Sequence, residues 1–180
     1  HTLDISPTVA PVVRFSIEEE RLEGGVYVRF SNPTGEKQLM IEFYDNKGLP
    51  IHSDLERKIE NAYWQEDYRR ASFDRIGKGA VQTNKHEDYI SALLEEIQEK
   101  RIQEAKFRVV VNYNHQPYLN FIPTLYNRLD CEILTAPYQT KPEEMASFVR
   151  VTNANIGVLI GEAGETLRLI TETGEVLDEE

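Results

Sequence analysis

The sequence predicts an α/β protein with mixed, mainly parallel sheets flanked by helices. In the second half, segments with helical apolar spacing alternate with short apolar runs, and this order is typical of strands joined by helical crossovers. Residues 107–113, FRVVVNY, form a nearly continuous run rich in valine, as expected for a strand buried on both faces. Hydrophobic residues make up 40% of the chain and charged residues 28%, which favours a packed core over disorder.

The first half predicts two helices around a β-hairpin. A helix is expected to start at Ser6-Pro7 and to end at Gly24-Gly25. The further predicted elements are a strand at 25–30, a loop at 31–37, a strand at 38–45, a helix at 53–67 and a connection at 69–84. The two strands are expected to pair, and Tyr63, Trp64 and Tyr68 are interpreted as packing residues of the helix.

The second half predicts a β-α-β-α-β order, which implies a parallel sheet covered by helices. The expected elements are one long helix at 86–105, a strand at 107–113, a helix at 116–130, a strand at 131–134, a helix at 141–153 and a strand at 156–160. A tight acidic loop, a second strand, a turn at Thr173-Gly174 and a third strand should complete this part.

Charge and composition exclude several classes of protein. The net charge of -11 and the isoelectric point near 4.9 argue against a surface for nucleic acid or anionic membranes, because phosphates require basic faces. No apolar run approaches the roughly 20 residues that span a bilayer. The single cysteine, Cys131, excludes an internal disulfide and a cysteine-rich zinc site, and we interpret it as a buried thiol. A cytoplasmic protein fits best.

Few side chains are candidates for chemistry. His115 follows the buried strand 107–113, where α/β sheets bind ligands, although a solvated loop histidine is the favoured interpretation. Ser31, with Arg29 two residues before it, suits an exposed nucleophile or phosphate carrier, or else a simple turn. Glu162 and Glu165 lie in the acidic loop, which predicts a metal site, the remains of one, or a solvated turn.

Four stretches resemble the α-D-phosphohexomutase family of phosphoglucomutases and phosphomannomutases. SPTVAP…GGVYVRFSNP resembles the segment that leads to the family's phosphoserine loop, Thr-Ala-Ser-His-Asn-Pro, and LMIEFYDNKGLPI resembles the strand and turn that follow. KFRVVVNYNHQPYLNFIPTLYNRLDCEIL resembles the first strand and helix of the family's second domain. ANIGVLIGEAGETLRLITETGEVL resembles the metal loop, usually Asp-Gly-Asp-Ala-Asp-Arg at its centre.

The resemblance implies a phosphoryl group carried by the serine and a Mg²⁺ held by three aspartates. Here those aspartate positions hold Gly161, Ala163 and Glu165, and Thr166 replaces the arginine. The serine loop is one residue shorter and lacks its histidine, so Ser31 matches either of two positions. Mg²⁺ needs several oxygen ligands, and without it phosphoryl transfer loses its charge stabilisation. We therefore expect no cofactor, or Mg²⁺ if Glu162 and Glu165 still bind it.

The resemblance also implies the domain organisation. Residues 1–80 would be a partial phosphohexomutase domain I and residues 86–180 domain II, within a longer polypeptide that resembles mannose-1-phosphate guanylyltransferase-related proteins with a sugar-1-phosphate nucleotidyltransferase. Three hypotheses remain open. The chain is a non-catalytic module of hexose-phosphate metabolism, an active phosphohexomutase region using Ser31, or a purely structural interaction domain. The expected partners are a hexose phosphate and other domains, but neither nucleic acid nor membrane.

Overall fold

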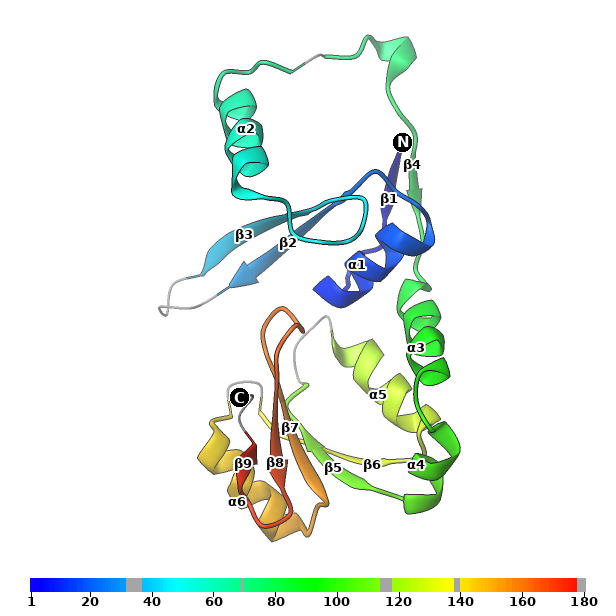
Figure 1. Cartoon of the computed structure of the whole chain (residues 1–180), viewed down its shortest axis with the longest axis vertical. Helices are drawn as coiled ribbons and strands as arrows, with labels where there is room; N and C mark the ends of the chain where they lie inside the picture. Colours follow the sequence, from blue (N-terminus) through cyan, green and yellow to red (C-terminus); the bar gives the residue numbers. More distant parts are fainter. Residues whose placement is uncertain (32–36, 69, 114–117, 138–139, 178–180) are drawn as a thin grey trace. The chain divides into compact units, whose positions relative to one another are not determined.

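The computed structural model describes residues 1–31, 37–68, 70–113, 118–137 and 140–177. Contacts divide the chain into two compact units. Unit 1 contains residues 1–6 and 12–85, and unit 2 contains residues 7–11 and 86–180. The predicted mixed α/β class is confirmed, since both units combine helices with strands (Figure 1).

Unit 1 contains two small sheets. Its elements are β1 (Thr2–Asp4), α1 (Ala10–Glu19, which begins in unit 2), β2 (Gly25–Ser31), β3 (Gln38–Tyr44), α2 (Ser53–Trp64), a 3-10 turn (Phe73–Arg75) and β4 (Gly79–Val81). Strands β2 and β3 form the predicted antiparallel hairpin, with Gly25 opposite Tyr44 and Ser31 opposite Gln38. Strands β1 and β4 pair in parallel, and neither strand was predicted, because three residues are too few to show a period.

Helix α1 starts later and ends earlier than predicted. The Asp4 carboxylate accepts hydrogen bonds from the Ser6 amide at 2.9 Å and the Ser6 hydroxyl at 2.6 Å. Ser6 therefore closes a turn after β1 instead of capping a helix. At the other end, Arg21 adopts a left-handed φ of 51°, and the Leu22 amide donates to the Ile17 carbonyl. The helix thus closes before the predicted Gly24-Gly25 stop.

The hairpin buries the face that carries its polar residues. Tyr27, Ser31 and Tyr44 are buried, and α1 packs so closely that a Cβ on Gly25 would lie 2.6 Å from Ile17 Cδ1. The opposite face is apolar and is 49–68% exposed at Val26, Val28, Phe30, Leu39 and Ile41. The predicted packing role of Tyr63, Trp64 and Tyr68 is wrong for the described residues, because all three side chains are exposed.

Unit 2 is built on a five-stranded sheet in the order β6-β5-β7-β8-β9. Its elements are α3 (Lys85–Glu95), α4 (Glu99–Ala105), β5 (Arg108–Val111), α5 (Tyr118–Arg128), β6 (Glu132–Thr135), α6 (Pro142–Thr152), β7 (Ile156–Ile160), β8 (Leu167–Thr171) and β9 (Val176–Leu177). Strand β5 pairs in parallel with β6 and β7, as predicted, and β8 and β9 add antiparallel partners.

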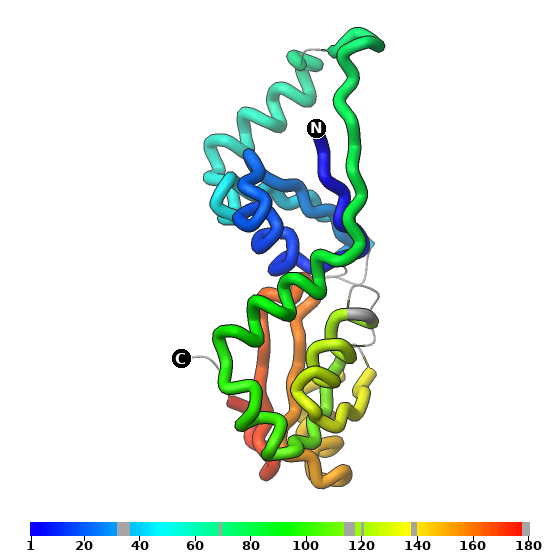
Figure 2. Tube along the Cα trace, turned by 90° about the vertical axis from the view of Figure 1, so that its right-hand side faces the viewer, coloured from blue at the N-terminus to red at the C-terminus, as the bar shows by residue number. Residues whose placement is uncertain are grey.

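The predicted single helix at 86–105 is wrong, because α3 and α4 are separate helices and the chain bends between them (Figure 2). In one straight helix, Ile102 would point about 120° away from Ile90. The bend brings Ile102 onto the cluster formed by Ile90, Leu94 and Leu129. Burial of this extra apolar side chain explains the break, although no glycine or proline lies at it.

Two apolar clusters lie on the two faces of the sheet. Helix α6 buries Met145 and Val149 against Val110, Leu159 and Ile170. The second cluster joins α3, α4 and α5, and Cys131 packs against it, where burial raises the pKa of its thiol. No helix among the described residues combines the length and the apolar character needed to cross a membrane.

Candidate functional site

The acidic loop joins β7 to β8 and spans 161–166. Its ends are tied by a hydrogen bond from the Gly161 amide to the Thr166 carbonyl at 2.9 Å. A second bond, from the Gly164 amide to the Gly161 carbonyl at 3.1 Å, closes a tight turn inside it. Gly164 has a φ of +81°, a conformation that side-chain-bearing residues rarely adopt. The loop backbone is therefore a specific, closed turn.

Two buried polar side chains hold this loop in place through hydrogen bonds to the backbone at its start. The Asn112 Oδ1 atom accepts a hydrogen bond from the Ile160 amide at 2.6 Å, and its Nδ2 donates to the Ile160 carbonyl at 3.2 Å. The Tyr118 hydroxyl lies 2.6 Å from the Gly161 carbonyl oxygen and 3.2 Å from that of Glu162. Asn112 is 4% exposed and Tyr118 is 2% exposed, so water competes little for these bonds.

A third support comes from residues 7–11, which belong to the same unit. The Ala10 amide, at the start of α1, donates a hydrogen bond to the Ala163 carbonyl at 3.3 Å. Pro11 also lies against the loop, since a Cβ on Gly164 would be 3.5 Å from its Cδ. The loop is thus fixed by three separate segments: the end of β5, the start of α5 and the start of α1.

Neither Asn112 nor Tyr118 is among the site residues that the sequence predicts. A signal for Asn112 was available, because a polar residue directly follows the buried valines of β5 and thus lies where parallel strands end. Nothing in the spacing of the sequence distinguishes Tyr118 from the apolar residues that follow it in α5.

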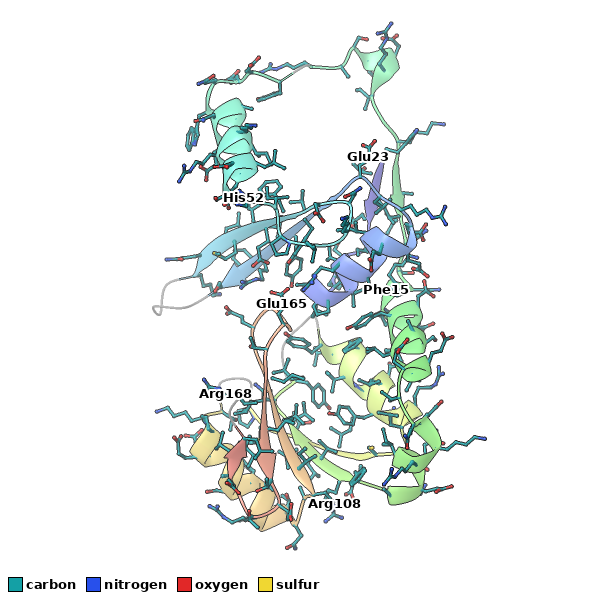
Figure 3. The ribbon with its side chains drawn as sticks, viewed as in Figure 1. Phe15, Glu23, His52, Arg108, Glu165 and Arg168 are labelled. Atoms are coloured by element: carbon teal, nitrogen blue, oxygen red, sulfur yellow. The ribbon has the colours of Figure 1, made fainter. Side chains whose placement is uncertain are left out.

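The predicted site residues lie on different elements. Ser31 is the last residue of β2 and is 8% exposed, so it lies inside the strand and not on the exposed loop that was expected. Arg29 shares its face of β2 and forms a two-point ion pair with Glu42, with Nη2–Oε1 at 3.2 Å and Nε–Oε2 at 3.3 Å. Glu162 and Glu165 lie in the loop after β7, where Figure 3 labels Glu165. His115 falls in 114–117, outside the described residues.

Comparison with known proteins extends the sequence resemblance. Residues 1–70 match the family model for phosphoglucomutase/phosphomannomutase, alpha/beta/alpha domain I. The phosphoglucosamine mutase of Nautilia profundicola is 23% identical over 192 residues, which cover 98% of this chain and 42% of that protein. The phosphoglucosamine mutase of Campylobacter jejuni strain 81-176 is 24% identical over 195 residues, with the same coverage.

Solved structures agree in fold. A phosphoglucomutase/phosphomannomutase family protein from Burkholderia thailandensis aligns with a TM-score of 0.65 and 14% identity, over 97% of this chain and 41% of that chain. The phosphoglucomutase pp63/parafusin from Paramecium aligns with a TM-score of 0.61 and 15% identity, over 92% of this chain and 39% of that chain. The chain is similar to the α-D-phosphohexomutases in sequence and in fold. It spans about two fifths of the length of these curated relatives.

The phosphohexomutase resemblance implies Mg²⁺ at the loop, and the donor set does not fit that ion well. Among the described residues, no group of three histidine, cysteine, aspartate or glutamate side chains is placed to hold a metal. The loop itself supplies only Glu162 and Glu165, whereas Mg²⁺ takes about six oxygens and needs its charge neutralised. At Gly161, an added Cβ would collide with Thr166 Oγ1, so this turn has no room for an aspartate there unless Thr166 moves.

Proposed function

We propose that the chain is a non-catalytic phosphohexomutase-like module of a protein of hexose-phosphate or sugar-nucleotide metabolism. One observation carries the proposal. The loop between β7 and β8 is held firmly by Asn112 and Tyr118, yet two of its three expected aspartate positions hold Gly161 and Ala163. A loop that is held in a fixed shape but lacks the charges that phosphoryl transfer needs is consistent with binding or assembly.

The surrounding protein is part of the same proposal. The chain covers 42% of its phosphoglucosamine mutase relatives, and we propose that it works beside further domains, including a sugar-1-phosphate nucleotidyltransferase. The names of these relatives suggest hexosamine phosphates as the first ligands to test. Calorimetry with glucosamine 6-phosphate and glucose 6-phosphate separates a binding module, which gives saturable heat, from a purely structural domain, which gives none.

The second candidate is an active phosphohexomutase region, and the position of Ser31 favours it. Ser31 ends β2 and lies within the stretch GGVYVRFSNP, whose end resembles the phosphoserine loop. Incubation with glucose 1,6-bisphosphate followed by phosphoprotein mass spectrometry tests this role, with Ser31→Ala as the control. Our proposal expects no phosphate on Ser31, and stoichiometric phosphate that disappears in the control would establish the active alternative.

Metal binding provides a separate test of the loop. We expect Mg²⁺ to leave the midpoint of thermal unfolding unchanged, because binding to the folded state alone would raise it. A rise with Mg²⁺ that is lost in Glu165→Gln would contradict the proposal. Glu172→Gln, at an exposed position after β8, is a matched control for the loss of one carboxylate.

A further inference from the structure

The face of the sheet that α6 covers changes character along its strands. Val110, Leu159 and Ile170 lie on this face and belong to the core beneath α6. Because side chains alternate along a strand, the next residues on the same face are Asn112 after β5, Gly161 after β7 and Arg168 in β8. This face of the sheet is therefore apolar beneath α6, and it carries polar side chains near the ends of β5 and β7.

Helix α6 does not extend over this polar row. It begins at Pro142, and a cavity of about 680 Å³ lies beside its first residues. Four residues with polar side chains line the cavity: Asn112, Thr140, Thr166 and Arg168. Gly161 lines it as well. Its volume lies in the range of about 300–1,000 Å³ that is usual for small-molecule sites.

The topology independently favours a ligand at this position. Strand β5 leads through α5 to β6 on one side, and β6 leads through α6 back across β5 to β7. The two crossovers run in opposite directions, so right-handed connections place α5 and α6 on opposite faces of the sheet. Ligands of open α/β sheets bind outside the carboxyl ends of the strands where the loops diverge in this way.

Arg168 gives the cavity a positive charge. It pairs in register with Leu159 and projects from β8, further along the strand than the loop that carries Glu165 (Figure 3). Arg29 and Arg108 are ion-paired with Glu42 and Glu132, whereas Arg168 forms no ion pair within the part of the chain that the structure describes. The cavity lining contains no carboxylate among the described residues, although the whole chain has a net charge of -11.

We propose that this cavity binds the phosphate or carboxylate end of a small molecule. The planar guanidinium of Arg168 can donate two parallel hydrogen bonds to either oxyanion. Thr166, directly before β8, also lines the cavity, and its hydroxyl is a further donor. The rest of the cavity accommodates a ligand larger than a free ion, of about the size of a hexose phosphate. This site does not depend on Ser31, on a metal or on phosphoryl transfer.

Amide NMR of the full chain tests the proposal with three probes: inorganic phosphate, acetate and glucose 6-phosphate. At least one of them should produce saturable shifts centred on Asn112, Thr166 and Arg168. Arg168→Gln should weaken binding at least about tenfold, and Thr166→Val, which keeps the charge, should weaken it about threefold. Arg101→Gln, at an exposed position of α4, should bind as the wild type does.

The probes distinguish the source of the oxyanion. Saturation with phosphate and glucose 6-phosphate assigns a phosphate site, and saturation with acetate assigns a carboxylate site. The proposal is overturned if no probe saturates, if Arg168→Gln binds as tightly as the wild type, or if Arg101→Gln weakens binding equally. Unchanged amide spectra away from the cavity verify that each variant is folded. Because the phosphorylation experiment reports on Ser31 and this one on Arg168, either can fail alone.

Discussion

Asn112 satisfies both backbone groups of Ile160 with a single amide. Asn112 directly follows β5, at the point where the backbone hydrogen bonds between β5 and β7 end. We predict that Asn112→Ala lowers the free energy of unfolding by about 2–4 kcal/mol, because a buried amide and a buried carbonyl lose their partners. Urea denaturation measures this loss. Asn127→Ala, at an exposed position of α5, should change the value by less than about 0.5 kcal/mol, and equal effects of the two variants would contradict this role.

Tyr126 links stability to alkaline pH. Burial raises its pKa to about 12 from an ordinary value of 10.0. Between these two values the unfolded chain has released a proton that the folded chain retains, so stability falls as pH rises above 10. We predict that Tyr126→Phe reduces the fall in unfolding free energy between pH 10 and pH 11.5, as measured by urea melts. In the wild type, absorbance titration should show a late-ionising component that is absent from Tyr126→Phe. An equal fall in both proteins would refute this assignment.

At the level of elements, the sequence predicts the strands and helices of unit 2 well. Valine runs and helical spacing identify β5, β6, β7, α5 and α6, because burial on two faces leaves a clear pattern. The break between α3 and α4 is invisible in sequence, since it follows from the packing of Ile102 on the cluster of Ile90, Leu94 and Leu129 and not from a helix-breaking residue. Strands β1 and β4 were missed because they are defined by their pairing alone.

The candidate site was only partly predictable for a similar reason. The loop with Glu162 and Glu165 follows from its acidic residues and its strand–loop–strand setting. Its supports and the cavity beside Arg168 depend on which side chains the sheet register brings together. The hairpin gives another example. The alternation in residues 25–30 predicts a strand, but it does not predict that the face with Val28 and Phe30 is exposed.

The packing of α6 on β7 depends on a glycine. A Cβ at Gly157 would lie 2.7 Å from Val149 Cγ2 and 3.0 Å from Met145 Cγ, so helix and strand would have to separate. We predict that Gly157→Ala destabilises the protein by about 1–3 kcal/mol through overpacking, as measured by urea denaturation. At Gly77 an added Cβ meets nothing closer than 3.5 Å, so Gly77→Ala should be nearly neutral. If Gly157→Ala leaves the free energy of unfolding unchanged, α6 can move away from β7 without a loss of stability, which would contradict the prediction.

At the scale of the whole molecule, the two units differ in how completely they cover their apolar surface. Unit 2 has helices on both faces of its sheet (Figure 1). Unit 1 leaves one face of its hairpin exposed at Val26, Val28 and Phe30, and contiguous apolar surface of this kind is costly in water. We therefore expect unit 2 to contribute the larger part of the chain's stability and to fold without unit 1.

The fragment 86–180 tests this expectation, because both apolar clusters and all five strands of the main sheet lie within it. We predict a cooperative urea transition, followed by circular dichroism. The amides around Ala163 should exchange faster than in the full chain, since the bond from Ala10 is lost and local opening becomes cheaper. The fragment 108–180 is the control, because removal of α3 and α4 uncovers Leu129 and should abolish the transition. An unfolded 86–180 fragment would mean that residues 7–11 or unit 1 are needed to form the sheet.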